Sequence, residues 1–533
     1  VATNKGVDYK HLDIQNFNLN AENIDYSEQN TSGKINSLTV KDKSGLNIQA
    51  LKTDFNYNNN GVSLKNLNLK TPQTSLKDEV IIGYASVRSI QENLGEMSVK
   101  ANLKNSKIGF KDILLFAPTL ANTSPFDTNP NAILSVNTIV SGKLNNISIP
   151  NLEVSGIGST KINASGKIVG FPDMKKAYFD LNIKNLESSS KDVAQFVPKG
   201  TIPSNIQLPP KFNTKGTFKG TMNNFATDLK LVSSFGNAKI KATFDQRRKN
   251  QEKYNAQNEL DNFDLGKLIK NDSIGKISLK ANVKGSGLNP KTANATVDGT
   301  ILKADFNDYV YTNLKLKGKI NNGLYNVKAN ANDPNLTFTM ISDGSFRGKY
   351  PSGKLKLNVD IADLRKLNLH AGALKLRGEI DADIQSADLD YLNGKVSANN
   401  FIIANEQEQF VLDSINVNAT STAEKNTLVV KSQFMNADVS GKYQLSKIGI
   451  ALQNSISNYY NINSNSKKVS VKDQQFAFKI DVKDNPILLK FIPELKSLSL
   501  IALSGTYNSV NDSIIVNGSI PKLVYGTNTI SGA

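Results

Sequence analysis

The eleven residues from Lys375 to Gln385 read Lys-Leu-Arg-Gly-Glu-Ile-Asp-Ala-Asp-Ile-Gln, and they decide the fold class. Every odd-numbered position is charged or polar, whereas every even-numbered position, from Leu376 to Ile384, is apolar or glycine. Successive side chains of an extended strand point to opposite faces, so this period of two predicts a β-strand with one apolar and one polar face. A helix could not separate the two sets in this way.

The composition limits the class of protein. Of the 533 residues, 21% are charged and 7% are aromatic, and there is no Cys and no Trp. This composition excludes a disordered chain and a disulfide-stabilised one. The net charge of +17 points to nucleic acid or anionic lipid as partners. Because the lysines are spread singly over the polar faces of many strands, we interpret them as a solvated outer surface and expect no nucleic-acid partner.

Targeting and membrane segments are not evident in the sequence. No apolar run approaches the roughly 18 residues that a membrane-spanning helix requires, and no signal peptide is recognisable. From the way it begins at Val1 and stops at Ala533, we expect the sequence to be an internal piece of a longer protein.

Short helices are expected to interrupt the strands. We predict one at residues 111–117, one capped by Ser189 or Ser190, and others that begin near Asp264, Asp363 and Asn485. These starts follow no fixed period, which excludes a strict solenoid of identical rungs.

Further local features are predicted in the same way. We predict a longer helix capped by Ser446, with Tyr459 on its apolar stripe, and a loop at residues 461–468. Asn60-Gly61 and Asn322-Gly323 predict type I′ hairpin turns and therefore antiparallel neighbours.

The strands are too many for a flat sheet. Roughly a dozen residues for each strand and turn give on the order of 35 strands, and a sheet of this size must curl, split or pack to hide its apolar face. The inward sets contain few of the bulky side chains that fill a sandwich, and Trp is absent from any aromatic girdle of a membrane barrel. We therefore predict a mainly β protein: a very long antiparallel sheet folded lengthwise, like a taco, into a hydrophobic groove with short interrupting helices.

This groove is expected to continue over residues 1–533 as one elongated segment, with possible sub-boundaries near 118–131, 198–212 and 461–470. Its interior is expected to receive an acyl chain. The residues predicted to line it are the apolar members of the most regular alternations: Ile277, Leu279, Ala281, Val283, Ala293, Ala295, Val297, Leu314, Leu316, Ile320, Leu355, Leu357, Val359, Ile361, Leu374, Leu376, Ile380, Ala382, Ile384, Phe476, Phe478 and Ile480.

Several short segments resemble a known family. They are Lys65 to Pro72, Phe196 to Pro203, Gly441 to Leu445 before the predicted helix, Asp484-Asn485-Pro486, Ile492-Pro493-Glu494-Leu495, and Leu503 to Tyr507. In these segments the chain resembles the TamB proteins of Bacteroidota, which belong to the AsmA-like superfamily of envelope proteins. The resemblance spans nearly the whole chain, but its motifs mark the boundaries of strands and helices and carry no catalytic chemistry.

The resemblance implies a periplasmic protein that is anchored in the inner membrane by a helix outside this sequence. It implies docking on an outer-membrane barrel of the Omp85 class, called TamA, and transport of phospholipids toward the outer membrane. It also implies a second role, in the assembly of outer-membrane proteins. The anchor and the docking end are not recognisable in these residues.

Catalytic and metal-binding chemistry is sparse. The two histidines, His11 and His370, are far apart, and no G-x-S-x-G nucleophile elbow is present. Asp381 and Asp383 share one strand face and could hold Ca²⁺, but without a glycine-spaced loop or a bidentate Glu we interpret them as solvated. Gly156-Ile157-Gly158 lacks the strand-and-helix context of a nucleotide-binding loop. We therefore expect no enzyme, no cofactor and no metal.

Three functions are weighed. The first is a lipid-conducting envelope protein that bridges the two membranes. The second is a periplasmic factor that holds unfolded outer-membrane strands at its groove or strand edges by β-augmentation. The third is a surface adhesin, which should carry aromatic or Ca²⁺-binding loops that this sequence lacks.

The predicted single sheet can be tested in solution. A compact chain of this length has a radius of gyration of roughly 24 Å, and we expect small-angle X-ray scattering to give a much larger value. A radius near the compact value would contradict the prediction.

Overall fold

The protein is described from a computed structural model. It describes residues 13–86, 89, 93–171, 173, 176–197, 200, 202–458, 470–492 and 494–533. His11, Tyr459, the predicted loop at 461–468, and Pro198, Lys199, Thr201 and Pro493 of the resembling segments lie outside the described residues.

The chain forms a mainly β structure in which 28 strands of the described part belong to one open antiparallel sheet. This confirms the predicted fold class, and a further three strands form a small second sheet. The chain divides into two compact units, Val1–Asn282 (unit 1) and Val283–Ala533 (unit 2). The division lies within strand β15 (Ile274–Ser286), and none of the three candidate sub-boundaries coincides with it.

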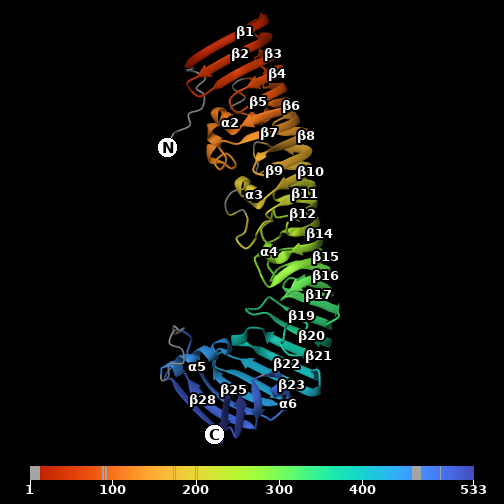
Figure 1. Cartoon of the computed structure of the whole chain (residues 1–533), viewed down its shortest axis with the longest axis vertical. Coiled ribbons are helices and arrows are strands. Elements are labelled where there is room, and N and C mark those ends of the chain that lie inside the picture. Colours follow the sequence, from red (N-terminus) through yellow and green to blue (C-terminus); the bar gives the residue numbers. More distant parts are fainter. Residues whose placement is uncertain are drawn as a thin grey trace. The chain divides into compact units, whose positions relative to one another are not determined.

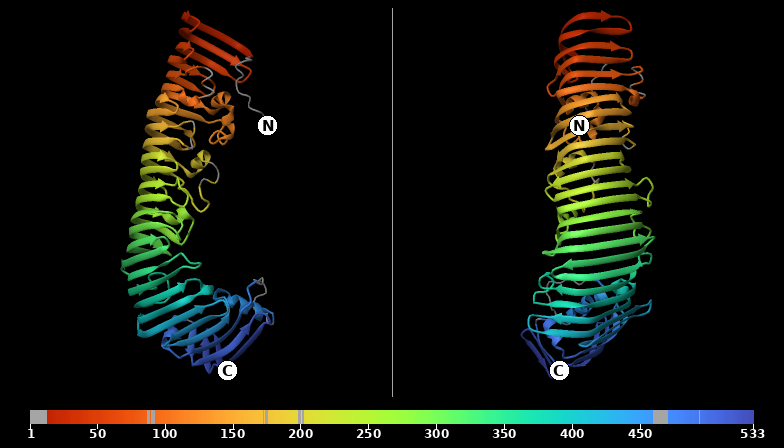
Figure 2. Two further views of the ribbon diagram at one scale, coloured as in Figure 1. Left: turned by 180° about the vertical axis from the view of Figure 1, so that it is seen from behind. Right: turned by 90° about the vertical axis from the view of Figure 1, so that its right-hand side faces the viewer.

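In unit 1, each strand pairs with the next one along the chain, from β1 to β14. The strands are β1 (Ile14–Tyr26), β2 (Asn30–Asp42), β3 (Asn47–Asn58), β4 (Gly61–Lys70), β5 (Ser75–Gly83), β6 (Ser98–Gly109), β7 (Ile133–Lys143), β8 (Asn146–Ile157), β9 (Thr160–Val169), β10 (Tyr178–Ser188), β11 (Phe212–Thr221), β12 (Asn224–Ser233), β13 (Gly236–Asp245) and β14 (Lys253–Asp264). The short helices are η1 (Leu94–Glu96), α2 (Phe110–Phe116), η2 (Pro118–Asn122), α3 (Ser190–Phe196) and α4 (Leu265–Ile269). Helices α2, α3 and α4 all lie on the same side of the sheet (Figures 1 and 2).

Unit 2 continues the same antiparallel order. Its strands in the large sheet are β16 (Asn294–Phe306), β17 (Tyr309–Asn321), β18 (Leu324–Asp333), β19 (Leu336–Ser345), β20 (Ser352–Asp363), β21 (Lys375–Ser386), β22 (Asn393–Ala404), β23 (Gln409–Ser421), β24 (Asn426–Ser432), β25 (Met435–Lys442), β26 (Gln475–Val482), β28 (Ile501–Asn508) and β29 (Ser513–Ser519). The small sheet contains β27 (Leu495–Leu498), β30 (Lys522–Tyr525) and β31 (Asn528–Ser531). The helices are η3 (Leu389–Tyr391), η4 (Leu445–Lys447), α5 (Ile448–Ser457) and α6 (Pro486–Phe491).

Most of the predicted helices are confirmed. Ser189 caps α3, since its Oγ accepts a hydrogen bond from the backbone N–H of Asp192 at 3.1 Å. Asp264 and Asn485 cap α4 and α6 in the same way. Ser446 does not cap α5, because the 3₁₀ turn η4 precedes the helix and places Lys447 at the cap. The Ser446 hydroxyl instead donates to Asp390 at 3.0 Å.

The two predicted Asn-Gly turns have different outcomes. Asn322 and Gly323 have φ angles of +47° and +79°, as a type I′ turn requires. Asn60 and Gly61 have no positive φ, so the type I′ prediction is wrong there. Gly61 is already the first residue of β4 and pairs with both Asn58 and Gly83.

A β-bulge changes the position of one predicted groove residue. In β20 the residue Val359 pairs with Phe338, whereas Ile361 pairs with Thr337, so an extra residue is inserted between the two pairs. A bulge reverses the face of the residues beyond it in a regular alternation. Ile361 therefore shares the outer face with Thr337 and is 36% exposed, while Ala362 takes the inner position.

Buried carboxylates fix several turns to the sheet. Asp333, which is 2% exposed, accepts hydrogen bonds from the Tyr309 hydroxyl, from the Asn335 N–H at 2.9 Å, and from the Thr312 N–H and hydroxyl at 2.8 Å each. Burial alone would raise the pKa of Asp333, but these hydrogen bonds outweigh it and hold the pKa below its usual 3.8.

The charged form of Asp333 should therefore contribute stability. A depressed pKa stabilises the fold above the ordinary value, and this contribution is lost as the pH falls from 3.8 through the folded-state pKa. We expect Asp333→Asn to lower the free energy of unfolding by about 1–3 kcal/mol at pH 7 and by less at about pH 3, measured by urea titration. Asp298→Asn is the control, since Asp298 is exposed and paired with Lys317 at 3.4 Å. Equal losses at both pH values would contradict this role.

Candidate functional site

The inner face of the sheet in unit 2 is built from rows of direct cross-strand partners, which share one face of an antiparallel sheet. Row A runs through Val297, Gly318, Val327, Ser342, Leu355, Ala382, Val396, Val417, Val430, Ala437, Ile480, Leu503 and Gly518. It crosses every strand from β16 to β29 in the large sheet, and Ser342 is its single polar member. Apart from Ser342, the row places an apolar residue or a glycine on each strand at the same height.

Two further rows flank row A on the same face. Row B is Gly299, Leu316, Ala329, Met340, Leu357, Ile380, Ala398, Ile415 and Ser432. Row C is Ala295, Ile320, Tyr325, Gly344, Gly353, Ile384, Gly394, Ala419, Leu428, Val439, Phe478, Gly505 and Val516. A Cβ on Gly344 or Gly353 would collide with the Tyr325 hydroxyl. These glycines therefore make room for the Tyr325 ring on the inner face.

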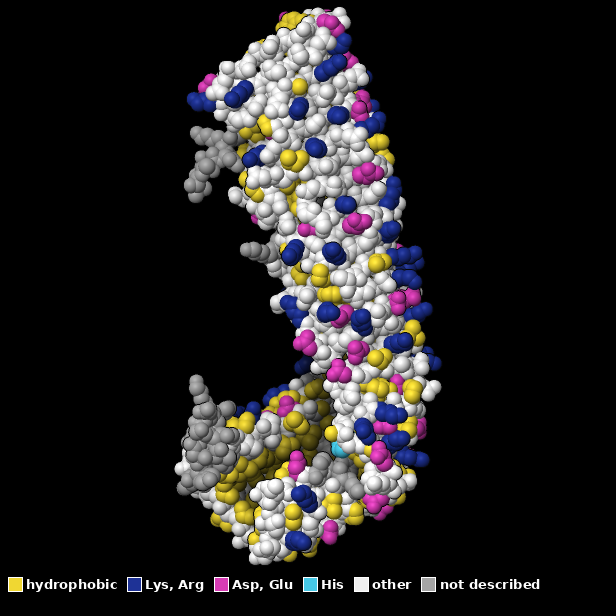
Figure 3. Space-filling view, in the orientation of Figure 1, with side chains coloured by type: hydrophobic (Ala, Val, Ile, Leu, Met, Phe, Trp, Pro, Cys, Tyr) yellow, Lys and Arg dark blue, Asp and Glu magenta, His cyan; other side chains and the backbone are white. Residues whose placement is uncertain are grey.

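The middle of this face is not covered. Every side chain of row A before Gly518, and every member of row B, is partly exposed and none is fully buried. Interior side chains of a filled core are closely packed on all sides. Rows A and B therefore line an open groove, and the space-filling view shows a hollow walled by hydrophobic side chains in the C-terminal part of the chain (Figure 3).

The opposite face of the same strands is polar. Lys315, Lys317 and Lys319 alternate with row members along β17 and are exposed. Ion pairs on this face are exposed and long, as between Lys354 and Asp383 at 3.6 Å, so they add little to stability. Their main effect is to keep the outer face hydrated.

Clusters of buried side chains close the rims of the groove. The turn after β20 buries Leu367 against Val359 and Ala362. Helix α6 buries Ile487 against Leu374, Ile403 and Leu412. These contacts reach Leu357 and Ile415 of row B from the strand ends, and in the described residues neither cluster includes a member of row A.

Helix α5 covers the other rim. Ala451 of this helix packs on Tyr443, Phe476 and Tyr507, and its Ser455 hydroxyl donates to Asp512 at 2.7 Å. Burial, together with the nearby charge of Asp438, raises the pKa of Tyr443 to about 12. The shift indicates a low-polarity environment under α5.

The structure brings most of the predicted lining residues together. Ala295, Val297, Leu316, Ile320, Leu355, Leu357, Ile380, Ala382, Ile384, Phe478 and Ile480 belong to rows A to C, and Leu314 and Leu376 lie on the same face beside Ala331 and Ile403. Leu279, Ala281 and Val283 in β15 are partly exposed, as an open face requires. Apart from Ile361 on the outer face, the others are buried at the rims or in β15 and do not line open space: Ile277, Ala293, Val359, Leu374 and Phe476.

The predicted groove covered unit 1, but apart from Ile277, Leu279 and Ala281 of β15 the list of lining residues included none from this unit. Row D runs through Leu103, Thr138, Leu152, Ala164, Ile183, Gly216, Leu229, Ile240 and Asn258. The rings of Phe179, Phe218, Phe225 and Phe244 follow one another beside it, with centroids 6.4, 5.2 and 5.9 Å apart. We name these four residues the aromatic stripe. Apolar and polar residues alternate over residues 214–231 and 236–244. This alternation was the sequence signal that could have predicted row D and the aromatic stripe in these strands.

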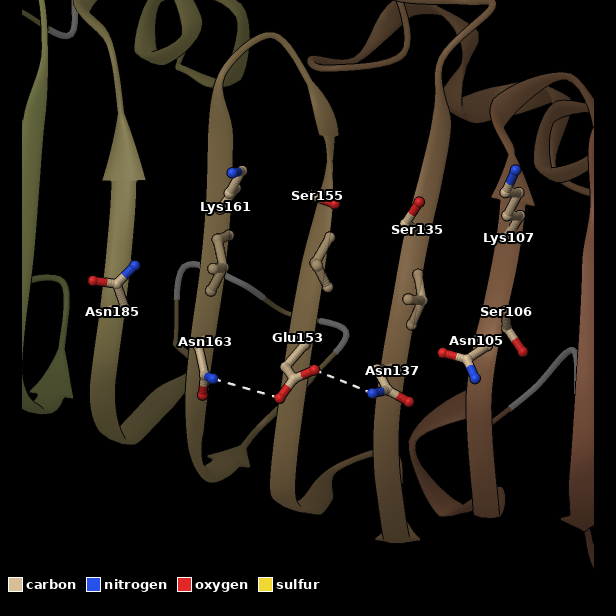
Figure 4. Close-up of a pocket in the computed structure, with 13 residues that line it drawn as sticks. Asn105, Ser106, Lys107, Ser135, Asn137, Glu153, Ser155, Lys161, Asn163 and Asn185 are labelled. Atoms are coloured by element: carbon tan, nitrogen blue, oxygen red, sulfur yellow. Dashed lines mark hydrogen bonds between the residues drawn. The ribbon is translucent and has the colours of Figure 1, made fainter.

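A polar depression of about 560 Å³ lies over β6 to β10 (Figure 4). The Glu153 carboxylate accepts hydrogen bonds from the Asn137 amide at 3.1 Å and from the Asn163 amide at 3.5 Å. Lys107 and Lys161 also line it. Glu153 is the single carboxylate of this lining, and the two amides hold it in place.

The residues considered for chemistry lie apart from one another. The His370 ring accepts a hydrogen bond from the Gly372 N–H at 3.0 Å in a turn, and Asp383 accepts from Gln385 at 2.9 Å on the outer face. Within the described ranges, no three His, Cys, Asp or Glu side chains gather as metal ligands. In the same part of the chain, no helix is long and apolar enough to cross a bilayer.

No protein-family model and no curated protein matches the sequence.

Proposed function

We propose that the chain binds the acyl chains of phospholipids along its inner face and conducts them through the groove. The observation that carries this proposal is the partial exposure of rows A and B over strand after strand. A soluble surface rarely leaves so extended an apolar face without a partner.

The energetics favour an apolar chain as the occupant. Removing a methylene group from water contributes about 0.8 kcal/mol, and rows A and B contain almost no group that could hydrogen-bond to a polar guest. A chain on these rows meets similar side chains on every strand, so no position traps it strongly. This uniformity is what movement along the groove requires.

The resemblance to the TamB family supports a setting for this activity. In that setting the protein lies in the periplasm, is anchored in the inner membrane by a segment outside this sequence, and meets an Omp85-type barrel of the outer membrane. The phospholipid would then move between the two membranes. The polar outer face suits an aqueous compartment of this kind.

A charge in the groove tests the proposal. Ile380 lies in row B between Leu357 and Ala398 and is partly exposed, so the carboxylate of Ile380→Asp can reach water and the fold should survive. A sliding acyl chain must then pass a hydrated charge, whose burial costs several kcal/mol. We expect the transfer of fluorescent phospholipid between vesicles to fall by about tenfold or more, with an unchanged circular dichroism spectrum.

The outer face of the same strand supplies matched controls. Gln385→Asp adds the same charge on the polar side, and Arg377→Asp reverses a charge there; both residues are exposed. Both variants should transfer lipid as the wild type does. Equal defects on the two faces, or unfolding caused by Ile380→Asp alone, would count against an open groove.

A second function is favoured by one observation, the edge strand β29. It pairs with β28, and the described part of the chain places no strand on its other side. Ile515 and Val516 are 55% and 51% exposed. An unpaired, apolar strand edge is a template for β-augmentation, which would suit a factor that holds unfolded outer-membrane strands.

Lysine substitutions at this edge separate the two functions. Charged edge residues discourage strand addition, so Ile515→Lys with Asn517→Lys should abolish photo-crosslinking of β29 to an unfolded outer-membrane protein. Phospholipid transfer should stay within about twofold of the wild type, since both positions are exposed and lie on the face opposite to rows A to C. Undiminished crosslinking in this variant would contradict strand capture at β29.

A further inference from the structure

Tyr325 brings a hydroxyl group onto the inner face of unit 2. It is a member of row C, where it lies between Ile320 and Gly344, and its side chain is partly exposed. A Cβ on Gly344 or on Gly353 would collide with the Tyr325 hydroxyl. Because both positions are glycines, the ring can lie across strands β19 and β20. The sheet therefore makes room for one polar group on a face that is otherwise apolar here.

The Tyr325 hydroxyl can donate a hydrogen bond to a ligand. Its one hydrogen-bond contact within the described residues is with the Ser342 Oγ at 3.5 Å, which is long for a hydrogen bond between two hydroxyls. The Ser342 hydroxyl has a single proton and donates it to the Lys354 carbonyl at 2.9 Å. Rows A to C contain no other side-chain hydroxyl on strands β16 to β22. Tyr325 and Ser342 therefore form the one polar spot in this part of the groove.

The β19–β20 loop connects this spot to the rim. The Phe346 ring lies against the Tyr325 ring, with centroids 5.0 Å apart, which places Phe346 on the inner side. Its backbone N–H donates to the Gly323 carbonyl at 2.8 Å, and the Arg347 Nε donates to the Asn322 carbonyl. Both carbonyls belong to the turn that ends two residues before Tyr325. Arg347 therefore lies at the rim end of row C, next to the tyrosine.

A second cation reaches the same turn from the β15–β16 loop. The Lys291 Nζ donates to the Gly348 carbonyl at 3.1 Å. A Cβ on Gly323, whose φ is +79°, would lie 2.8 Å from the Arg347 Cγ and 2.6 Å from the Lys291 carbonyl oxygen. The two basic residues thus converge on one glycine, which has no side chain to keep them apart.

These two cations can bind an anion. In the described part of the chain neither Arg347 nor Lys291 forms an ion pair, and both are exposed. Arg347 uses its Nε for the turn, so both Nη groups can face a ligand. Lys349 is already engaged, since its ammonium lies 5.0 and 5.2 Å from the ring centres of Tyr350 and Tyr391. A guanidinium beside an ammonium suits a phosphate, which offers several oxygen acceptors.

We infer that this rim of unit 2 binds the glycerophosphate end of a phospholipid whose acyl chains lie on rows A and B. The inference rests on the proposed function and adds the place where the polar end is held. The Tyr325 hydroxyl donates to an ester carbonyl of the lipid, and Arg347 and Lys291 bind the phosphate. From the inner face to the rim, the order of hydroxyl and then cations is the order of ester and then phosphate in the lipid. A tyrosine, with an apolar ring and a polar tip, suits the boundary between them.

The phosphate contact is tested with two lipids that differ only in that group. Phosphatidic acid and diacylglycerol with identical fluorescent acyl chains are titrated into the purified chain. We expect the wild type to bind phosphatidic acid about tenfold more tightly, and this preference should weaken with added salt. Arg347→Gln combined with Lys291→Gln should reduce the affinity for phosphatidic acid to that for diacylglycerol and leave diacylglycerol binding unchanged.

The matched control removes two cations from the outer face of the same unit. Lys315 and Lys319 are exposed on β17, and neither has an ion pair within the described residues. Lys315→Gln with Lys319→Gln should keep the full preference for phosphatidic acid. A preference that persists in the rim variant, or that falls equally in the control, overturns the inference.

The ester contact is tested with the dialkyl ether analogue of phosphatidic acid, which lacks both ester carbonyls. We expect the wild type to bind the diacyl lipid about fivefold more tightly than the ether, the effect of one hydrogen bond. Tyr325→Phe keeps the ring against Phe346 and removes only the hydroxyl, so it should bind the two lipids equally and the ether as the wild type does. An undiminished preference in Tyr325→Phe overturns the role of this hydroxyl.

Glycerol 3-phosphate separates a lipid site from a site for free phosphate. If it does not compete at concentrations that saturate with phosphatidic acid, the site requires the lipid, as we infer. Binding of both lipids with equal affinity by the wild type overturns the inference and leaves the proposed function standing, because diacylglycerol reports on the groove alone. Binding of neither lipid overturns both, and glycerol 3-phosphate that then binds the wild type but not the rim variant would identify a free-phosphate site.

Discussion

The structure depends on the cross-strand ladder of a sheet that keeps adding antiparallel neighbours. Each strand within the sheet satisfies its backbone groups through two neighbours, so the backbone hydrogen bonds do not depend on what covers the two faces. What the hydrogen bonds do not offset is the free-energy cost of exposing an apolar face to water. In unit 2 the alternation places row A on one side of thirteen successive strands, and in the described residues the small second sheet reaches this row at Leu503, where Leu495 and Leu498 pack. An apolar face of this kind is the direct consequence of a repeated two-residue period.

The rims show how the protein stabilises an uncovered face. Short helices and turns bury their apolar residues against the strand ends, as Ile487 does on Leu374 and Leu412 and as Ala451 does on Phe476 and Tyr507. Hydrogen-bonded carboxylates such as Asp333 and Asp192 fasten the turns between strands. The stabilising contacts are therefore concentrated at the two ends of the strands. The middle needs no side chain from elsewhere in the chain, which is why it can remain open to a ligand.

The sequence allowed the fold class to be predicted because alternation is a local property. Leu376, Ile380 and Ile384 lie on the inner face as the stretch from Lys375 to Gln385 predicted. Two kinds of residue were misplaced. The prediction that Ile361 faces the groove was wrong because one inserted residue in β20 reverses the face of the positions that follow it. The alternation that precedes a bulge gives no sign of it. Leu374 is in a buried cluster because α6, more than a hundred residues later, packs on it.

The inner faces of the two units differ in ways that alternation cannot express. Row A in unit 2 is aliphatic, with Val and Leu at most positions, whereas the inner face of unit 1 carries four phenylalanines in succession. A pattern of apolar and polar positions treats Val327 and Phe225 alike. Their shapes differ, because Val offers a small branched side chain, while Phe225 offers a flat ring that packs against the rings of Phe218 and Phe244. The same period of two therefore produces an aliphatic surface in one unit and a partly aromatic one in the other, and only the identity of each apolar residue decides which.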